Sequence, residues 1–298
     1  MAKYHINSKG NPAPCRAIKG KCPFGGADQH FGSRQEAFAE AERRHEQESG
    51  FSADKLEINW GADVVATNRV DTDNGYTETL VQTLPSGKTR EFIHNNTVWD
   101  DGSICDEVTD TKGKMHCDGS FPAAVVREKQ PDGSFTIKSQ GWYKHGKLHR
   151  SDDLPAFVSA GDNDFAGVQE WWQNGEMHRD GEKPAYIVNH RNGGQEEQWW
   201  QHDQMKRDGD KPVKVVKDAD GSVTWERFSD SFGRFHRDGD KPASTSYHKN
   251  GQVKEETWYQ NGLMHREGGP AQVTYAEDGT VVKEFWAKFG SEDLSHRR

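Results

Sequence analysis

The sequence predicts a mostly β protein, an elongated antiparallel sheet of β-hairpin repeats of about 29 residues, with a small α-containing module at its N-terminus. Three observations predict this class. The stretch at residues 178–185, His-Arg-Asp-Gly-Glu-Lys-Pro-Ala, recurs in close copies over the C-terminal two thirds of the chain. Asn-Gly and Asp-Gly pairs, typical of hairpin turns, stand between the copies. Only 32% of the residues are hydrophobic and the mean hydropathy is -1.05, which is low for a thick core but fits a thin sheet stiffened by ten tryptophans.

Residues 1–50 form the predicted N-terminal module. Ser33 is a good helix N-cap and Glu36 follows three residues later, which together make a capping box. The stretch after Ser33 is rich in Ala, Glu, Gln and Arg, all of which favour helices, and Gly50 ends it. We therefore expect one helix over residues 33–49.

The same module carries the elements YHIN at residues 4–7, CRA at 15–17, CPFGG at 22–26 and HF at 30–31. This opening resembles a leader segment shared by many uncharacterised proteins of phages and actinobacteria, in which it precedes very different C-terminal domains. The resemblance implies a portable module, an address or a metal knuckle, and a phage or prophage origin.

Two cysteines and two histidines of this module predict a structural zinc site with the ligands His5, Cys15, Cys22 and His30. Thiolate and imidazole are the ligands that zinc prefers, and a closed set of four is typical of structural sites. A short polar segment has too small a core to fold stably without a metal site or a disulfide. The spacings are not those of common zinc fingers, so the alternative is two reduced thiols in a loop.

Residues 51–108 are less regular, and we expect them to form an irregular β cap of the sheet. The Pro85-Ser86-Gly87 turn separates two stretches rich in β-branched and aromatic residues. We expect the strand at residues 90–94 to pair with the strand at residues 76–81.

Residues 109–298 contain the repeats. Their period is regular, since the motif histidine, replaced once by Lys206, recurs at intervals of 33, 29, 28, 30 and 29 residues. A fixed period in this range predicts a repeat array. The motif residues are His116, His149, His178, His236 and His265, with Arg150, Arg179, Arg207, Arg237 and Arg266.

Each repeat reads as one hairpin. A small residue and then a β-branched residue follow the motif proline at a spacing of two, as in Ala185 and Ile187, which places both on one face of a strand. A turn such as Asn250-Gly251 comes next, and the return strand carries a tryptophan. Strands lie about 4.8 Å apart, so equivalent side chains should form ladders with a spacing of about 10 Å.

The pattern Trp-x3-Gly-x2-His-Arg-x-Asp-Gly-Pro-Ala resembles MORN-like repeats of the bacterial and phage kind. The period here is longer than that of a single MORN hairpin. The resemblance implies a twisted single-layer sheet that is used for protein or membrane contacts and has no chemistry of its own.

The charge of the chain narrows the class of partner. A net charge of -9 argues against a nucleic-acid binder and against an anionic membrane surface, because both need clustered Lys and Arg. No apolar run approaches the roughly 20 residues that span a bilayer. We therefore expect a soluble cytoplasmic protein whose partner is another protein, and self-association through an exposed sheet edge.

The His-Arg-Asp triplet also occurs in the catalytic loop of protein kinases, but here Gly-x-x-Pro follows it and no phosphate-binding loop is present. Because an active site is needed once, six similar copies favour structural roles: the aspartate caps its turn, while histidine and arginine bridge repeats. Histidines buried in their neutral form are favoured over a ladder that titrates near neutral pH. An enzyme would have only His94, Asp100, Asp101 and the N-terminal Cys and His residues as unrepeated candidates.

The tryptophans are the predicted binding residues: Trp142, Trp172, Trp200 and Trp258. In the pairs at residues 171–172 and 199–200, adjacent side chains point to opposite faces of a strand, so Trp172 and Trp200 should lie away from the other tryptophans. The sequence thus predicts a non-enzymatic, phage-encoded binding protein that inhibits or sequesters a host defence protein in the host cytoplasm. The alternatives are a virion-packaged or structural phage protein and an antitoxin-like repeat protein.

Overall fold

The computed structural model describes residues 4–6, 12–14, 30–31, 63–117, 121–161 and 165–292. The chain divides into two compact units, residues 1–140 and 141–298, and each is described by itself. All the regular secondary structure of the described residues is β-strand. No helix long and apolar enough to cross a membrane occurs among these residues. The helix expected over residues 33–49 lies outside the described residues.

The first unit is an antiparallel meander in which the strands from β3 to β8 pair in chain order, beside a separate pair, β1 and β2. The bounds are β1 Tyr4–Ile6, β2 Pro12–Pro14, β3 Val64–Thr72, β4 Gly75–Thr83, β5 Thr89–Val98, β6 Ile104–Thr109, β7 Ala124–Lys129 and β8 Phe135–Gly141. The pairing expected between residues 76–81 and 90–94 is confirmed, with Glu78 opposite His94. β3 and β4 have nine residues each and β5 has ten, and the pairing of β3 with β4 shifts its register between Thr67 and Val70.

One face of the first unit is buried. Side chains alternate along its strands, so that Leu80, Phe92 and Val108 are buried while their chain neighbours are more exposed. The same buried face also carries the polar side chains of His94 and Asp106. Buried charges are costly unless they are paired, so this face must contain a satisfied polar network.

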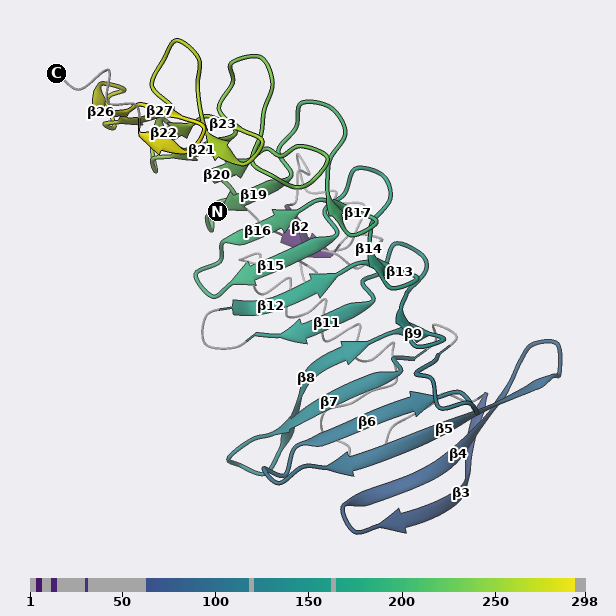
Figure 1. Ribbon diagram of the computed structural model, residues 1–298. Helices are drawn as coiled ribbons and strands as arrows, with labels where there is room; N and C mark the ends of the chain where they lie inside the picture. Colours follow the sequence, from purple (N-terminus) through teal and green to yellow (C-terminus); the bar gives the residue numbers. More distant parts are fainter. Residues whose placement is uncertain are drawn as a thin grey trace. The chain divides into compact units, whose positions relative to one another are not determined.

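The second unit is also an antiparallel meander, and Figure 1 shows its long strands lying side by side in chain order. These strands are β11 Phe157–Ala160, β12 Phe165–Glu170, β15 Tyr186–His190, β16 Gln195–Gln198, β19 Lys214–Lys217, β20 Val223–Arg227, β21 Ser244–Tyr247, β22 Val253–Thr257, β25 Gln272–Tyr275 and β26 Val281–Phe285. Each repeat supplies two of them, so the predicted antiparallel sheet of hairpins is confirmed.

Most of the repeats also contain a second, smaller hairpin that the sequence reading missed, and we call these the tip hairpins; at residues 229–235 an isolated bridge between Ser229 and Phe235 takes its place. Their strands are β9 Tyr143–Lys144, β10 Lys147–Leu148, β13 Trp172–Gln173, β14 Glu176–Met177, β17 Trp200–Gln201, β18 Gln204–Met205, β23 Tyr259–Gln260, β24 Leu263–Met264, β27 Ala287–Lys288 and β28 Ser291–Glu292. The tip hairpins and the motif loops lie at one edge of the second unit (Figure 1). The Asx-Gly turns of the main hairpins lie at the other edge.

Turn chemistry explains the tip hairpins. Asn174 and Gly175 have φ values of 54° and 85°, and a turn with two positive φ values favours the pair Asn-Gly. The Gly175 N–H donates to the Leu148 carbonyl of the preceding repeat at 2.8 Å, and Gly290 donates to the Met264 carbonyl at 3.0 Å in the same way. Consecutive tip hairpins are therefore hydrogen-bonded to one another.

The motif alanine is buried because it pairs with the repeated tryptophan. The N–H of Trp171 donates to the Ala185 carbonyl at 2.8 Å, and Trp258 donates to Ala271 at the same distance. Neither alanine has any exposed surface, and both tryptophans are buried. Val213 occupies the equivalent position in the next repeat, where it is also buried and accepts the Trp199 N–H at 2.9 Å.

Candidate functional site

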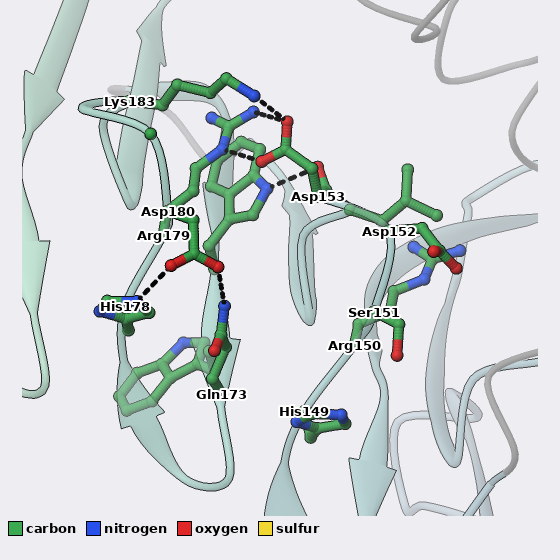
Figure 2. Close-up of a pocket in the computed structure, with 14 residues that line it drawn as sticks. His149, Arg150, Ser151, Asp152, Asp153, Gln173, His178, Arg179, Asp180 and Lys183 are labelled. Atoms are coloured by element: carbon green, nitrogen blue, oxygen red, sulfur yellow. Dashed lines mark hydrogen bonds and ion pairs between the residues drawn. The ribbon is translucent and has the colours of Figure 1, made fainter.

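The motif arginine is held on three sides. The guanidinium carbon of Arg179 lies 3.7 Å from the ring centre of Trp171. Arg179 Nε donates to Asp153 Oδ1 at 2.7 Å, and one Nη donates to the Pro184 carbonyl at 3.0 Å. Figure 2 shows the Arg179 guanidinium facing the Asp153 carboxylate. Asp153 belongs to the preceding repeat, so Arg179 joins two repeats.

The same arrangement recurs along the second unit. The arginine–ring distances are 3.6 Å for Arg150 on Trp142, 3.9 Å for Arg207 on Trp199, 3.6 Å for Arg237 on Phe228 and 3.8 Å for Arg266 on Trp258. Arg237 donates to Asp210 at 2.6 Å, and Arg266 donates to Asp240 at 2.8 Å. The aspartate that accepts these hydrogen bonds stands four residues after the histidine position of the preceding repeat. The sequence analysis did not identify it.

The same aspartate also accepts a hydrogen bond through its backbone carbonyl. The indole N–H of Trp171 donates to the Asp153 carbonyl at 3.0 Å, and Trp258 donates to the Asp240 carbonyl at 3.1 Å. Asp153 and Asp240 have φ values of 58° and 53°, a left-handed conformation that Asp adopts more readily than most residues. One residue therefore binds the tryptophan through its carbonyl group and the arginine through its carboxylate.

The acids are held in their charged form. Burial alone would raise the pKa of Asp153, but hydrogen bonds from Arg179 and Lys183 outweigh burial and lower it. Hydrogen bonds from Arg237 and Lys241 lower the pKa of Asp210 to about 2. Carboxylates that stay ionised at any physiological pH act as fixed ion-pair partners and are poorly suited to transferring protons.

A groove of about 350 Å³ lies between two motif loops, and Figure 2 shows the residues that line it. His178 Nε2 lies 3.1 Å from Asp180 Oδ1, and Gln173 donates to the other Asp180 oxygen at 3.1 Å. A second groove, of about 580 Å³, contains the equivalent pair His236 and Asp238, also 3.1 Å apart. The grooves are copies of one polar surface, and neither contains a unique set of groups.

The motif histidines occupy several environments. His149 Nδ1 accepts a hydrogen bond from the Asn174 N–H of the next repeat at 3.2 Å, and His236 accepts one from Asn261 at the same distance. His178 stacks on His202 with ring centres 4.2 Å apart. In the first unit, His116 stacks on Phe92 at 5.8 Å. His265 stacks on Phe289 with ring centres 4.1 Å apart.

Half-buried aromatic side chains occupy the same position in several tip hairpins, and we call this set the aromatic column. Its members each open a tip hairpin and are half-buried: Tyr143, Trp172, Trp200 and Tyr259. Trp172 Nε1 donates to Glu170 at 2.7 Å, and Trp200 Nε1 donates to Gln198 at 3.0 Å. The two tyrosines were missed, although each directly follows a repeat tryptophan. The other two predicted binding residues, Trp142 and Trp258, are buried in the core.

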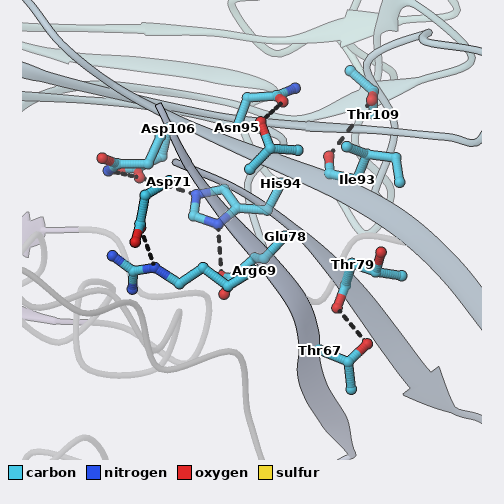
Figure 3. Close-up of polar contacts among 12 residues, drawn as sticks. Thr67, Arg69, Asp71, Glu78, Thr79, Ile93, His94, Asn95, Asp106 and Thr109 are labelled. Atoms are coloured by element: carbon cyan, nitrogen blue, oxygen red, sulfur yellow. Dashed lines mark hydrogen bonds and ion pairs between the residues drawn. The ribbon is translucent and has the colours of Figure 1, made fainter. Parts of the chain in front are cut away.

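The buried network of the first unit is centred on His94, which has no exposed surface. Its Nδ1 lies 2.9 Å from Glu78 and its Nε2 lies 3.0 Å from Asp106, as Figure 3 shows. Asn96 donates to Asp106 at 2.7 Å, and Arg127 Nε donates to it at 3.1 Å. Burial alone would raise the pKa of Asp106, but the His94 hydrogen bond, the Arg127 charge and the Asn96 hydrogen bond lower it.

The unrepeated candidates for catalysis do not converge in the described residues. His94 is enclosed, Asp101 accepts a turn hydrogen bond from the Ser103 N–H at 2.8 Å, and Asp100 is exposed. Burial, with the charge of Glu107, raises the pKa of Cys105 to about 11, which leaves its thiol protonated and weakly nucleophilic at neutral pH. The geometry of this region stabilises the fold and offers a substrate no access to His94.

The predicted zinc ligands fall largely outside the described part of the chain. Cys15 and Cys22 lie outside the described residues, His5 is placed only by its backbone in β1, and His30 is half-buried. The described residues contain no group of three or more His, Cys, Asp or Glu side chains that could hold a metal ion. The zinc site therefore stays a prediction.

No family model, no curated protein and no solved structure matches the chain.

Proposed function

We propose that this chain is a non-enzymatic binding protein that engages a protein partner through the tip-hairpin edge of its repeat sheet. The observation that carries the proposal is the aromatic column. Trp172 and Trp200 occupy equivalent positions in consecutive tip hairpins, and each is half-buried with its N–H already bonded. Rigid aromatic side chains with one accessible face are common anchors of protein interfaces.

The contacts of the motif residues support a role without catalysis. The guanidinium of Arg179 stacks on Trp171 and donates hydrogen bonds to Asp153 and Pro184. Equivalent contacts recur in the neighbouring repeats. Because several arginines form the same structural contact, none of them is singled out as a catalytic residue. The repeated geometry instead presents equivalent anchors about 10 Å apart, the spacing of every second strand in a sheet.

The charge of this edge indicates the kind of surface it would meet. Asp180, Asp208 and Asp238 are exposed in successive motif loops, and the chain carries a net charge of -9. Acidic side chains around an aromatic anchor favour a partner with Lys and Arg at its rim, because complementary charge speeds association and excludes acidic competitors. We therefore propose a partner surface with an apolar centre and a basic rim.

The proposed setting is a bacterial host. The leader elements CRA and CPFGG resemble those of phage and actinobacterial proteins, and this resemblance supports a phage-encoded chain that inhibits or sequesters a host defence protein. The MORN-like pattern of the repeats supports a contact role in the same way.

The test is capture of partners from a bacterial lysate by the full chain and by Trp172→Ala and Trp200→Ala variants. The matched control is Trp99→Ala, because Trp99 is 45% exposed but lies in the first unit, outside the aromatic column. We expect at least a tenfold loss of the specific partner for each column variant, about 1.4 kcal/mol or more, and no loss for the control. Equal recovery by all four proteins would reject the column as the binding surface.

A further inference from the structure

The last long strand of the second unit, β26, has an open outer edge within the described residues. β26 pairs with β25 on one side, and no described strand pairs with its other side (Figure 1). In earlier repeats the equivalent strands β16, β20 and β22 pair on that side with β19, β21 and β25 of the following repeat. A strand at the edge of a sheet presents a row of unpaired backbone N–H and C=O groups. The outer edge of β26 is therefore a template for one more strand.

The side chains of β26 are more exposed than those of the strands that have a neighbour on both sides. Val281 is 54% exposed and Glu284 is exposed. Their equivalents in β22, Val253 and Glu256, are half-buried, and β25 lies beside that strand. The surface of β26 is thus accessible where the earlier repeats are covered by the next strand.

A glutamate in the second long strand of each repeat binds the strand that follows. Glu256 lies opposite Val273 of β25 and accepts a hydrogen bond from the Tyr275 hydroxyl at 2.8 Å. The same contact recurs at two earlier junctions between repeats, from Tyr247 to Glu226 at 3.0 Å and from Lys217 to Glu197 at 2.6 Å. The donor is each time a tyrosine or a lysine, two residues after the residue opposite the glutamate.

Glu284 is the next member of this series. It lies opposite Val273 within its own hairpin, as Glu256 lies opposite Thr245 within the preceding one. Its carboxylate forms no hydrogen bond or ion pair with any residue that the structure describes. Glu284 therefore has the position of a strand-binding glutamate without the strand.

The backbone of Glu284 also faces the open edge. In the preceding repeat the Trp258 N–H, directly after β22, donates to the Ala271 carbonyl, directly before β25, at 2.8 Å. Backbone groups along a strand point to its two neighbours in alternation, so Glu256, two residues earlier, faces β25 as well. Glu284 is equivalent to Glu256, so its N–H and carbonyl point to the side on which the next strand would lie.

Nothing in β26 itself closes this edge. Its pairing with β25 shifts register between Thr274 and Tyr275, but β20 and β22 have the same shift and still pair with the following strand. β26 also contains no proline, a residue that often protects the edge of a sheet. The edge is therefore competent to pair.

We propose that the outer edge of β26 binds an extended peptide segment of a partner protein, which adds to the sheet as an antiparallel strand. The segment has a β-branched residue opposite Glu284 and a tyrosine or lysine two residues after it. The hydroxyl or ammonium group of that residue donates to the Glu284 carboxylate. Backbone hydrogen bonds supply affinity and the side-chain contact supplies selectivity, as is usual when a peptide adds a strand to a sheet.

The test is fluorescence anisotropy of the full chain with labelled peptides based on residues 269–276, the segment that pairs with the equivalent edge of β22. The unchanged peptide and its Tyr275→Lys form should bind with dissociation constants below about 1 mM. The Tyr275→Glu form should bind at least tenfold more weakly, because its carboxylate meets that of Glu284. A Val273→Pro peptide lacks the N–H that faces the edge and should not bind.

Charge reversal on the protein should reverse the preference among peptides. We expect Glu284→Lys to bind the Tyr275→Glu peptide at least tenfold more tightly than the Tyr275→Lys peptide. Glu267→Lys is the matched control, because Glu267 is exposed in a motif loop and the change in charge is the same. The control should keep the wild-type order. Trp172→Ala should also keep it, because this edge is separate from the aromatic column.

Three results would overturn the proposal. The first is failure of the unchanged and Tyr275→Lys peptides to bind the wild-type chain. The second is a peptide order that Glu284→Lys leaves unchanged or that Glu267→Lys reverses equally. The third is a dimer of the chain alone, seen by sedimentation and weakened by Glu284→Lys, which would assign the edge to a second copy. Reversal by Glu284→Lys alone, in a chain that sediments as a monomer, supports strand addition by a partner.

Discussion

Arg179 reaches back 26 residues to Asp153 and donates to its carboxylate at 2.7 Å. The two residues belong to consecutive repeats, and the ring of Trp171 lies against the arginine. The motif that dominates the sequence is therefore a clamp between neighbouring repeats. The contact with Asp153 joins Arg179 to the preceding repeat, as expected for an array in which each repeat contacts only its neighbours.

Arg179→Lys should destabilise the second unit. Lysine keeps the charge but cannot stack a flat guanidinium on Trp171 or donate from two nitrogens to one carboxylate. We expect a loss of about 1–3 kcal/mol in the free energy of unfolding, measured by urea denaturation with tryptophan fluorescence. Asp180→Asn is the control, because Asp180 is exposed and contacts only its own repeat. Equal stability of Arg179→Lys and wild type would argue against the clamp.

Asp106→Asn should be the most damaging conservative change in the first unit. It leaves Arg127 buried without its carboxylate partner, and breaking a buried pair costs about 3–5 kcal/mol. The control is Asp71→Asn, which breaks the exposed pair with Arg69 and should cost less than about 1 kcal/mol. Thermal denaturation of both variants measures the difference, and similar losses would contradict the network.

Asp210 should titrate far below an ordinary aspartate. Its pKa in the folded chain is about 2, because Arg237 and Lys241 donate hydrogen bonds to it, whereas the usual value is 3.8. The folded state therefore holds this proton more weakly than the unfolded state. The stabilisation is fully present above about pH 4 and is lost as the pH falls toward 2. Carboxyl carbon NMR measures the titration, which Arg237→Gln should move upward. A wild-type midpoint near 3.8 would refute the ion pair.

Ala185→Phe should destabilise the second unit by overpacking. Ala185 has no exposed surface and accepts the hydrogen bond of the buried Trp171, and the next repeat has the larger Val213 at the equivalent position, bonded to Trp199. Overpacking a core position costs about 1–3 kcal/mol. Ala160→Phe is the same substitution at an exposed strand end and should be neutral. The midpoints of urea denaturation compare them, and a neutral Ala185→Phe would mean that the site has room.

Periodicity and turn residues were enough to predict the sheet. The Asx-Gly pairs mark the main turns, and the small and β-branched residues after each proline are buried, as at Val213 and Val215. The pairing of β4 with β5 followed from two β-rich stretches around one turn. These signals are local, since each depends on residues only a few positions apart.

The contacts between repeats could not be read in this way. Asp153 stands outside the His-Arg-Asp triplet, and its partner Arg179 lies a full repeat away, so only a comparison of repeats in three dimensions connects them. The tip hairpins were missed because their strands have two residues each, too short for a pattern of alternation. The network of His94 depends on the register of neighbouring strands, which the hydrophobic pattern alone did not specify.

A double-mutant cycle between Arg179 and Asp153 is the most direct test of the repeat-to-repeat clamp. The measurement is the free energy of unfolding of wild type, Arg179→Met, Asp153→Asn and the double variant. We predict a coupling energy of about 1 kcal/mol or more, because the two residues contact each other across consecutive repeats. Additive losses, with a coupling near zero, would contradict the clamp and leave the regular spacing of the motif without a structural cause.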